Sequence, residues 1–269
     1  MENHQFIPFK NSTVFYSISG QGKTVVLIHG FGEDGNIWNE TVKKLKNNFR
    51  VIVPDIPGSG KSTILKDENT QISIDDYAEV IIHILGNESV TTCAVIGHSM
   101  GGYIALAIAE KYPEILTGFG LFHSTAFADN EERKQARLKS IDFIQTNDAI
   151  SFLRTSIPGL FADKFKKEHA EVIEKLIDAG MSFSSETLIQ YQKAMLNRPE
   201  RKRLLQKTNL PVLFIIGEKD QAIPLQQSLA QCHLPSIASV HILPNAGHMG
   251  MLEEGELCTD AIISFLSNV

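Results

Sequence analysis

Runs of apolar residues of strand length recur along the first half of the chain and alternate with segments that have helical spacing. The clearest are VVLIH at Val25–His29, RVIVP at Arg50–Pro54 and the run that ends at Gly97. A strand that is apolar at nearly every position must be buried on both faces, which is typical of parallel strands covered by helices. The order strand, helix, strand, helix therefore predicts an α/β protein with a mostly parallel sheet and helices on both faces.

The alternation stops after His123 and resumes near residue 208. Between these points no good strand run occurs, and four segments have helical spacing, separated by proline and glycine. We therefore expect a core made of residues 1–123 and 208–269, with residues 124–207 inserted as an all-helical lid. Such a lid would cover the carboxyl edge of the sheet, where open α/β sheets bind their ligands.

Composition and charge limit the classes of partner. The 269 residues carry a net charge of −6 without a basic stripe, so nucleic acid is not an expected partner. No run approaches the roughly 18 apolar residues that a membrane span requires, and the first residues lack the apolar core of a signal peptide. The three cysteines are scattered, as in reduced proteins. We expect a cytoplasmic protein, either monomer or homodimer, acting on a small molecule.

The segment CAVIGHSMGG at Cys93–Gly102 contains the pattern G-x-S-x-G, with Ser99 at its centre. An apolar run precedes the pattern and an Ala-rich helical segment follows it, so Ser99 is expected at a sharp strand-to-helix turn. Glycines on both sides allow close packing around such a turn, and the turn exposes the hydroxyl. The alternative is an ordinary glycine-rich loop, which would not need an apolar run before it and a helical segment after it. Ser99 is the predicted nucleophile.

A serine hydroxyl is a weak nucleophile and needs a base, which in turn needs a group to orient it. Among the nine histidines, His248 lies in the polar turn Pro244–Gly250, between the last apolar strand and the last helix. The end of that strand would bring His248 to the same sheet edge as Ser99, so we predict it to be the base. Two acids, Glu218 and Asp220, follow the preceding apolar strand and could orient it.

Five segments together resemble the α/β-hydrolase superfamily, and the resemblance covers about two-thirds of the chain. They are HGFGED at His29–Asp34, PDIPGSGKS at Pro54–Ser62, GHSMGG at Gly97–Gly102, GEKDQAIP at Gly217–Pro224 and NAGHMGMLEE at Asn245–Glu254. The chain is most similar to lidded serine hydrolases such as bacterial carboxylesterases and haloperoxidase-like hydrolases. The resemblance implies the α/β-hydrolase fold with an eight-stranded sheet, and an acyl-enzyme mechanism without cofactor or metal.

The resemblance also favours roles for individual residues. It selects Asp220 over Glu218 as the orienting acid, and it implies that the backbone N–H groups of Phe31 and Met100 hold the oxyanion. His29 and His98 are more typical of side chains that hold loops in place than of bases. The predicted triad, in chain order, is Ser99, Asp220 and His248.

The expected reaction is hydrolysis of a small or medium carboxylic ester. Carbon–carbon bond hydrolases of the same fold keep the triad and tend to need a cation in the lid, for which Arg137, Arg154 and Arg198 are available. Those enzymes more often have Asn in place of His98, which favours the esterase. A ligand-binding receptor on a hydrolase scaffold is the third alternative, although a receptor has no need of an intact triad.

Residues in and near the lid could line the acyl pocket, or they could simply pack in the lid's own small core. Those that we predict to bind substrate are His123, Phe127, Phe152, Ile157, Phe161 and Met249.

Overall fold

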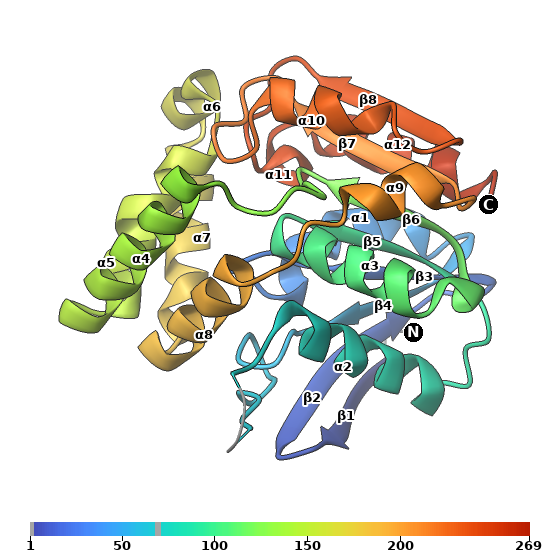
Figure 1. Ribbon diagram of the computed structural model, residues 1–269, viewed down its shortest axis with the longest axis horizontal. Coiled ribbons are helices and arrows are strands. Elements are labelled where there is room, and N and C mark those ends of the chain that lie inside the picture. The colour runs from blue at the N-terminus through green and yellow to red at the C-terminus, as the bar shows by residue number, and fades with distance from the viewer. Residues whose placement is uncertain (1–2, 68–70) are drawn as a thin grey trace.

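The computed structural model describes residues 3–67 and 71–269. Within these ranges an eight-stranded sheet forms the centre of the molecule, in the order β1-β2-β4-β3-β5-β6-β7-β8 (Figure 1). Strand β2 is antiparallel to both of its neighbours, and all pairs from β4 to β8 are parallel. The strands are β1 (Asn3–Phe9), β2 (Ser12–Ser19), β3 (Lys23–Ile28), β4 (Phe49–Pro54), β5 (Cys93–His98), β6 (Leu116–Phe122), β7 (Val212–Gly217) and β8 (Ala238–Leu243).

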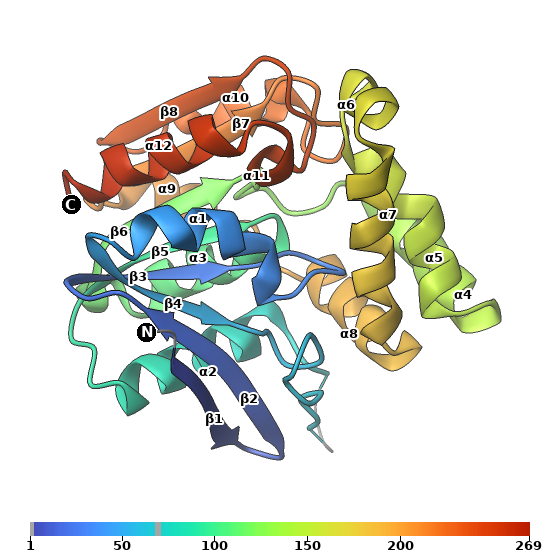
Figure 2. The same ribbon diagram turned by 180° about the vertical axis from the view of Figure 1, so that it is seen from behind.

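Helices cover both faces of the sheet. Figure 1 shows α2, α3, α9 and α10 in front of it, and Figure 2 shows α1 and α12 on the opposite face. Their bounds, with the short α11, are α1 (Asn39–Leu45), α2 (Ile74–Asn87), α3 (Met100–Lys111), α9 (Lys202–Lys207), α10 (Leu225–Cys232), α11 (Gly250–Glu253) and α12 (Gly255–Leu266). Because both faces are covered, β5 and β7 are buried at every position, as their apolar sequences require.

Sequence patterns predicted most of these elements. The segments Phe6–Lys10 and Thr13–Ile18 predict a hairpin, which β1 and β2 form. Ser73 followed by Asp76 predicts a helix start, and the two residues form the capping box of α2, which satisfies backbone N–H groups of the first turn. Two details differ. The apolar spacing of residues 37–46 predicts one helix, but this segment starts as a 3-10 turn at Gly35–Trp38 and only then becomes α1. Helix α10 was not expected, because half of its short sequence LQQSLAQC is polar.

Between β6 and β7 the described chain forms helices without a strand. Figures 1 and 2 place α4–α8 together beyond one end of the sheet, and we call this group the helical insertion. Helix α9 instead packs against α3 of the core, so residues 124–207 do not all lie in the insertion. The apolar spacing of residues 166–179 predicts one helix, but the structure interrupts it at His169, between α6 and α7. The bounds are α4 (Glu131–Thr146), α5 (Ala149–Ser156), α6 (Asp163–Glu168), α7 (Ala170–Ala179) and α8 (Ser185–Leu196).

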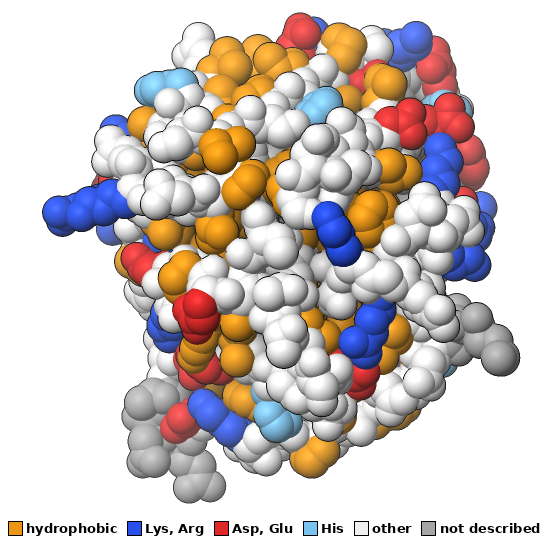
Figure 3. All heavy atoms as spheres, turned by 90° about the vertical axis from the view of Figure 1, so that its right-hand side faces the viewer, with side chains coloured by type: hydrophobic (Ala, Val, Ile, Leu, Met, Phe, Trp, Pro, Cys, Tyr) orange, Lys and Arg blue, Asp and Glu red, His pale blue; other side chains and the backbone are white. Residues whose placement is uncertain are grey.

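On the side of the molecule that lies away from the insertion, acidic and basic side chains are scattered among apolar and uncharged surface (Figure 3). In the part of the chain that the structure describes, no helix is long and apolar enough to cross a membrane.

Candidate active site

Ser99 lies in the tight turn between β5 and α3, with φ 49° and ψ −112°. This left-handed backbone is strained for a residue with a side chain and is of a kind concentrated at functional sites. The Ser99 N–H donates to the carbonyl of Phe122 at 2.9 Å, which ties the turn to β6. A Cβ at Gly97 would lie 2.0 Å from the carbonyl oxygen of Gly101, so only glycine permits the chain to fold back this closely. The turn leaves Ser99 half-exposed.

A hydrogen-bonded chain connects Ser99 to a histidine and an acid. The Nε2 atom of His248 lies 2.9 Å from Ser99 Oγ, and its Nδ1 lies 2.8 Å from Asp220 Oδ2. His248 and Asp220 are buried, with 3% and 4% of their surfaces exposed, so little solvent competes for these contacts. A base that contacts the hydroxyl and an acid that orients the base is the arrangement that activates a serine.

Asp220 is held as a carboxylate by its surroundings. Its Oδ1 accepts hydrogen bonds from the N–H groups of Ala222 and Ile223, each at 2.8 Å. Burial by itself would raise the pKa of Asp220, but its interaction with His248 holds the pKa well below its usual range. Glu218, the competing acid in the sequence, is exposed, and its carboxylate contacts the Lys219 ammonium.

A glycine where β7 ends allows the two loops to meet. A Cβ at Gly217 would lie 2.0 Å from the carbonyl oxygen of Gly247, in the turn that carries His248. The two loops approach backbone to backbone at this point, which brings Asp220 and His248 together. The apolar runs predict that both residues follow strand ends, but no local pattern indicates this requirement for glycine.

A buried ion pair between His98 and Glu33 supports the turn that carries His248. His98 Nε2 donates to the carbonyl oxygen of His248 at 2.9 Å, and His98 Nδ1 donates to Glu33 Oε2 at 3.0 Å. The same carboxylate oxygen accepts the N–H of Gly30 at 2.7 Å. Burial alone would lower the pKa of His98, but the Glu33 carboxylate raises it, and the charge of His98 in turn keeps the pKa of buried Glu33 below its usual range. His98 therefore holds a loop, as expected.

The helical insertion also contacts the turn that carries His248. The N–H of His248 donates to the carbonyl of Leu160 at 2.6 Å. Glu253 accepts hydrogen bonds from the N–H groups of Gly247, Met249 and Ala162 at 2.9, 3.1 and 2.8 Å. His248 is thus positioned by core and insertion together.

A cavity of about 140 Å³ opens onto Ser99 and His248. Its walls come from the loop after β3, from α4 and α8 of the insertion, and from the loop that follows Asp220. The side chains that the insertion adds are Arg133, Arg137, Leu160, Gln192 and Met195. The cavity is smaller than the roughly 300–1,000 Å³ of sites for drug-sized ligands, which favours a small substrate.

Comparison with known proteins identifies the fold. Residues 23–255 match the family described as alpha/beta hydrolase fold. The chain belongs to the α/β-hydrolase family.

This hydrolase resembles proteins of several activities. It is 27% identical over 260 residues to the dihydrolipoyllysine-residue acetyltransferase component of the acetoin cleaving system of Pseudomonas putida, covering 94% of this chain but only 66% of that protein. It is 26% identical over 267 residues to 2-hydroxy-6-oxo-6-(2'-aminophenyl)hexa-2,4-dienoic acid hydrolase of Metapseudomonas resinovorans, covering 94% and 87%. A solved structure of a thermophilic esterase from Thermogutta terrifontis, with malate bound, has a TM-score of 0.92 at 27% identity, covering 99% and 98%.

The six residues predicted to bind substrate lie elsewhere in the hydrolase. All six belong to the described residues, and none lines the cavity at Ser99. Phe152 and Phe127 contact Phe31 and Lys202 respectively, while Ile157, Phe161 and Met249 are buried. The prediction favoured apolar residues, but the cavity wall at Ser99 is partly polar, with Arg133, Arg137 and Gln192 among its side chains.

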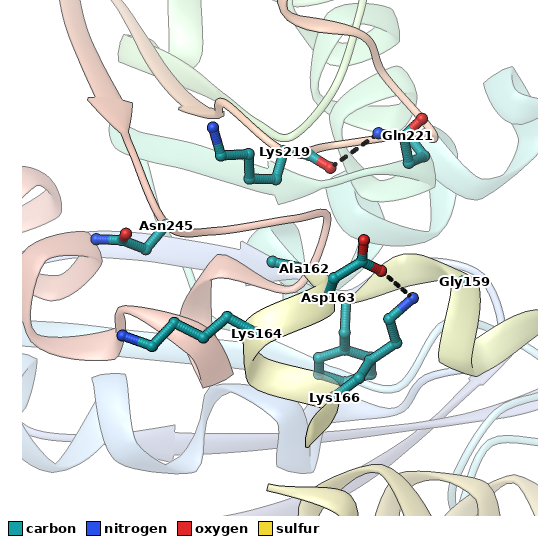
Figure 4. A pocket seen from close by; sticks show the side chains of 9 residues that line it. Gly159, Ala162, Asp163, Lys164, Lys166, Lys219, Gln221 and Asn245 are labelled. Carbon is teal, nitrogen blue, oxygen red and sulfur yellow. Dashed lines mark hydrogen bonds and ion pairs between the residues drawn. The ribbon is translucent and has the colours of Figure 1, made fainter. Parts of the chain in front are cut away.

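Phe161 lines a second cavity of about 350 Å³. Residues of α6 line this cavity together with Lys219, Gln221 and Asn245 (Figure 4). The figure shows Lys219 and Gln221 from one loop above Asp163 and Lys166 of α6, which form an ion pair at 2.7 Å. Neither Ser99 nor His248 lines this second cavity.

His123, which was also predicted to bind substrate, is instead buried beside Asp220. It is 1% exposed, with φ 47°, and its Nδ1 accepts the N–H of Gly217 at 3.1 Å and lies 3.4 Å from Asp220 Oδ2. Burial lowers its pKa to about 4, so His123 is neutral at pH 7. His123 is therefore placed behind the acid, away from the cavity.

His123, Asp220 and His248 also place one possible ligand atom each within 4.8 Å of one another, a spacing that could hold a metal ion. In this hydrolase the facing atoms are already engaged, because Asp220 Oδ2 contacts His248 Nδ1 and His123 Nδ1 accepts a backbone hydrogen bond.

Proposed function

We propose that this hydrolase cleaves a small carboxylic ester through an acyl-enzyme intermediate, with Ser99 as nucleophile, His248 as base and Asp220 as orienting acid. The observation that carries the proposal is the unbroken chain of contacts, 2.9 Å from Ser99 Oγ to His248 Nε2 and 2.8 Å from His248 Nδ1 to Asp220. The Ser99 end of this chain of contacts faces a cavity of about 140 Å³.

In the first half of the reaction, Ser99 Oγ attacks the ester carbonyl carbon while His248 Nε2 takes the hydroxyl proton. The tetrahedral intermediate collapses, the C–O bond to the alcohol breaks, and His248 returns the proton to the leaving oxygen. Water then attacks the acyl-enzyme with the same proton transfers and releases the acid. Throughout, the carboxylate of Asp220 holds His248 in the tautomer that presents a free Nε2 and stabilises the imidazolium.

The negative charge on the carbonyl oxygen needs donors that are already in place. Met100 is the first residue of α3, so its N–H has no partner within the helix. The N–H of Phe31 comes from the loop after β3, and the Phe31 side chain lines the cavity. We assign these two N–H groups to the oxyanion hole, where loss of one donor typically raises the barrier by about 3–4 kcal/mol.

The esterase of Thermogutta terrifontis, at 27% identity, supports an ester substrate. A second candidate is hydrolysis of a carbon–carbon bond in a keto acid. It is favoured by the presence of Arg137 in the cavity, and by the relative whose name states a dienoic acid substrate.

The test compares wild type, Ser99→Ala and Ser264→Ala, whose serine is exposed on α12 far along the chain from the site. We expect a fluorophosphonate to label wild type and Ser264→Ala at Ser99 but not to label Ser99→Ala. Hydrolysis of 4-nitrophenyl esters from acetate to octanoate should fall by at least about 10⁴-fold in Ser99→Ala. Equal rates in all three proteins, or labelling at another serine, would refute the proposal. Cleavage of a 2-hydroxy-6-oxo-dienoic acid in preference to every ester would instead select the second candidate.

A further inference from the structure

Two arginine side chains of α4, Arg133 and Arg137, line the cavity that also contains Ser99 and His248. They are four residues apart, and residues at this spacing share one face of a helix. Because the cavity has a volume of only about 140 Å³, a group that meets the arginines must belong to the same small molecule as the carbonyl attacked by Ser99.

The guanidinium of Arg137 is held in place. Its Nε contacts Asp129 Oδ2, and its Nη1 donates to Gln192 Oε1 at 3.1 Å and lies 3.4 Å from Met195 Sδ. Asp129 is also paired with buried Arg198 at 2.8 Å, so one carboxylate serves two guanidinium groups. This cluster therefore has an excess of positive charge, and Arg137 is already oriented before any ligand binds.

Arg133 has no such partner. Its side chain is half-buried, and its guanidinium forms no hydrogen bond or ion pair with any residue in 3–67 or 71–269. The one acid in the cavity lining, Glu33, is occupied by His98 and the N–H of Gly30. In a chain whose net charge is −6, this cavity has two arginines and no free carboxylate.

We propose that the substrate is an ester that also carries a carboxylate, which Arg133 binds with Arg137 beside it. The proposal rests on the proposed esterase function and adds the substrate class. A guanidinium presents paired N–H donors that match the two oxygens of a carboxylate, and hydrogen bonds between charged groups are stronger than neutral ones. Arg133 supplies unused donors, and Arg137 supplies a second positive charge in a fixed position.

Two pairs of esters serve as probes. Monomethyl glutarate carries the carboxylate on its acyl half, and its neutral counterpart, methyl 5-methylhexanoate, has an isopropyl group in that place. Acetylglycolate carries the carboxylate on its alcohol half, and isobutyl acetate is its neutral counterpart. Acid release in a pH-stat gives kcat/KM for each ester. In at least one pair we expect the anionic ester to be preferred by about tenfold or more.

The decisive variant is Arg133→Gln, which removes the unpaired cation without leaving a buried carboxylate alone. We expect it to lower the anionic-to-neutral ratio of kcat/KM by about tenfold or more. The control is Lys134→Gln, which removes the same charge from the next position of α4, where the side chain is exposed and outside this cavity. It should leave the ratio within about twofold, as expected for a solvent-screened charge. No anionic preference in either pair, or an unchanged ratio in Arg133→Gln, overturns the proposal.

A binding experiment separates this proposal from the esterase proposal. Calorimetry of monomethyl glutarate and acetylglycolate with Ser99→Ala needs no turnover. Weaker binding of either ligand after adding Arg133→Gln supports the carboxylate site even if the wild type hydrolyses no ester. Absence of binding, or binding that Arg133→Gln does not change, overturns the site even if neutral esters are hydrolysed.

Discussion

Replacing Glu33 by Gln removes one charge from beneath the His248 turn while keeping the size of the side chain. Two hydrogen bonds end on Glu33 Oε2, from Gly30 N at 2.7 Å and from His98 Nδ1 at 3.0 Å. His98 in turn donates to the carbonyl of His248 at 2.9 Å. Both side chains are buried, so solvent does not replace what the substitution removes.

The magnitude follows from these contacts. A hydrogen bond to a charged group contributes about 1.5–3 kcal/mol, against about 0.5–1.5 kcal/mol for a neutral one. Two such bonds become neutral in Glu33→Gln, so we expect the free energy of unfolding to fall by about 2–3 kcal/mol. Glu33→Ala leaves His98 and the N–H of Gly30 without an acceptor, and we expect it to lose about 3–5 kcal/mol.

The effect should depend on pH in a defined direction. The pKa of His98 is raised from 6.5, so its contribution is complete below 6.5 and is lost as the pH rises through the folded-state pKa. The pKa of Glu33 is lowered from 4.5, so its contribution is complete above 4.5 and is lost as the pH falls through the folded-state pKa. The difference between wild type and Glu33→Gln should therefore be largest between pH 4.5 and 6.5.

Urea unfolding at pH 6 and pH 9 measures this difference, with Glu40→Gln as a control because that acid is exposed on α1. Ester hydrolysis in Glu33→Gln should also slow by about 10- to 100-fold, since a displaced base is less effective. The reasoning is wrong if Glu33→Gln is as stable as wild type at pH 6, or if the stability difference grows above pH 6.5.

Two further predictions concern the contacts of the core. Arg201 donates to both oxygens of Asp75 and to Glu110, all at 3.0 Å, so Arg201→Gln should reduce the free energy of unfolding by about 1–3 kcal/mol. The urea midpoint checks this, and a drop just as large in Arg203→Gln, where the side chain is exposed, would contradict it. Because the pKa of buried His123 is lowered to about 4, wild type should lose up to about 3 kcal/mol between pH 6.5 and 4. His123→Asn should lose less over that range, and equal slopes of stability against pH in the two proteins would show the argument to be wrong.

Sequence patterns were sufficient for the elements that depend on neighbours along the chain. The apolar runs predicted the buried strands, and Ser73 with Asp76 predicted the start of α2. The glycines around Ser99 predicted the turn between β5 and α3, because a left-handed backbone and close packing are local requirements. These inferences were reliable because hydrophobic periodicity and turn chemistry act over a few residues.

Other features were decided by tertiary structure alone. Position after the strand left both Glu218 and Asp220 open, and the family resemblance favoured Asp220. The structure shows Asp220 in contact with His248, where Gly217 closely approaches Gly247. The support of His248 by Glu33 and His98, and the arginines of α4 beside Ser99, join segments that are distant in sequence. Such contacts depend on strand register and on how the insertion docks onto the sheet, and neither leaves a local pattern. Thus the sequence by itself determined the fold and the turn that holds Ser99, and the tertiary structure decided which side chains surround that serine.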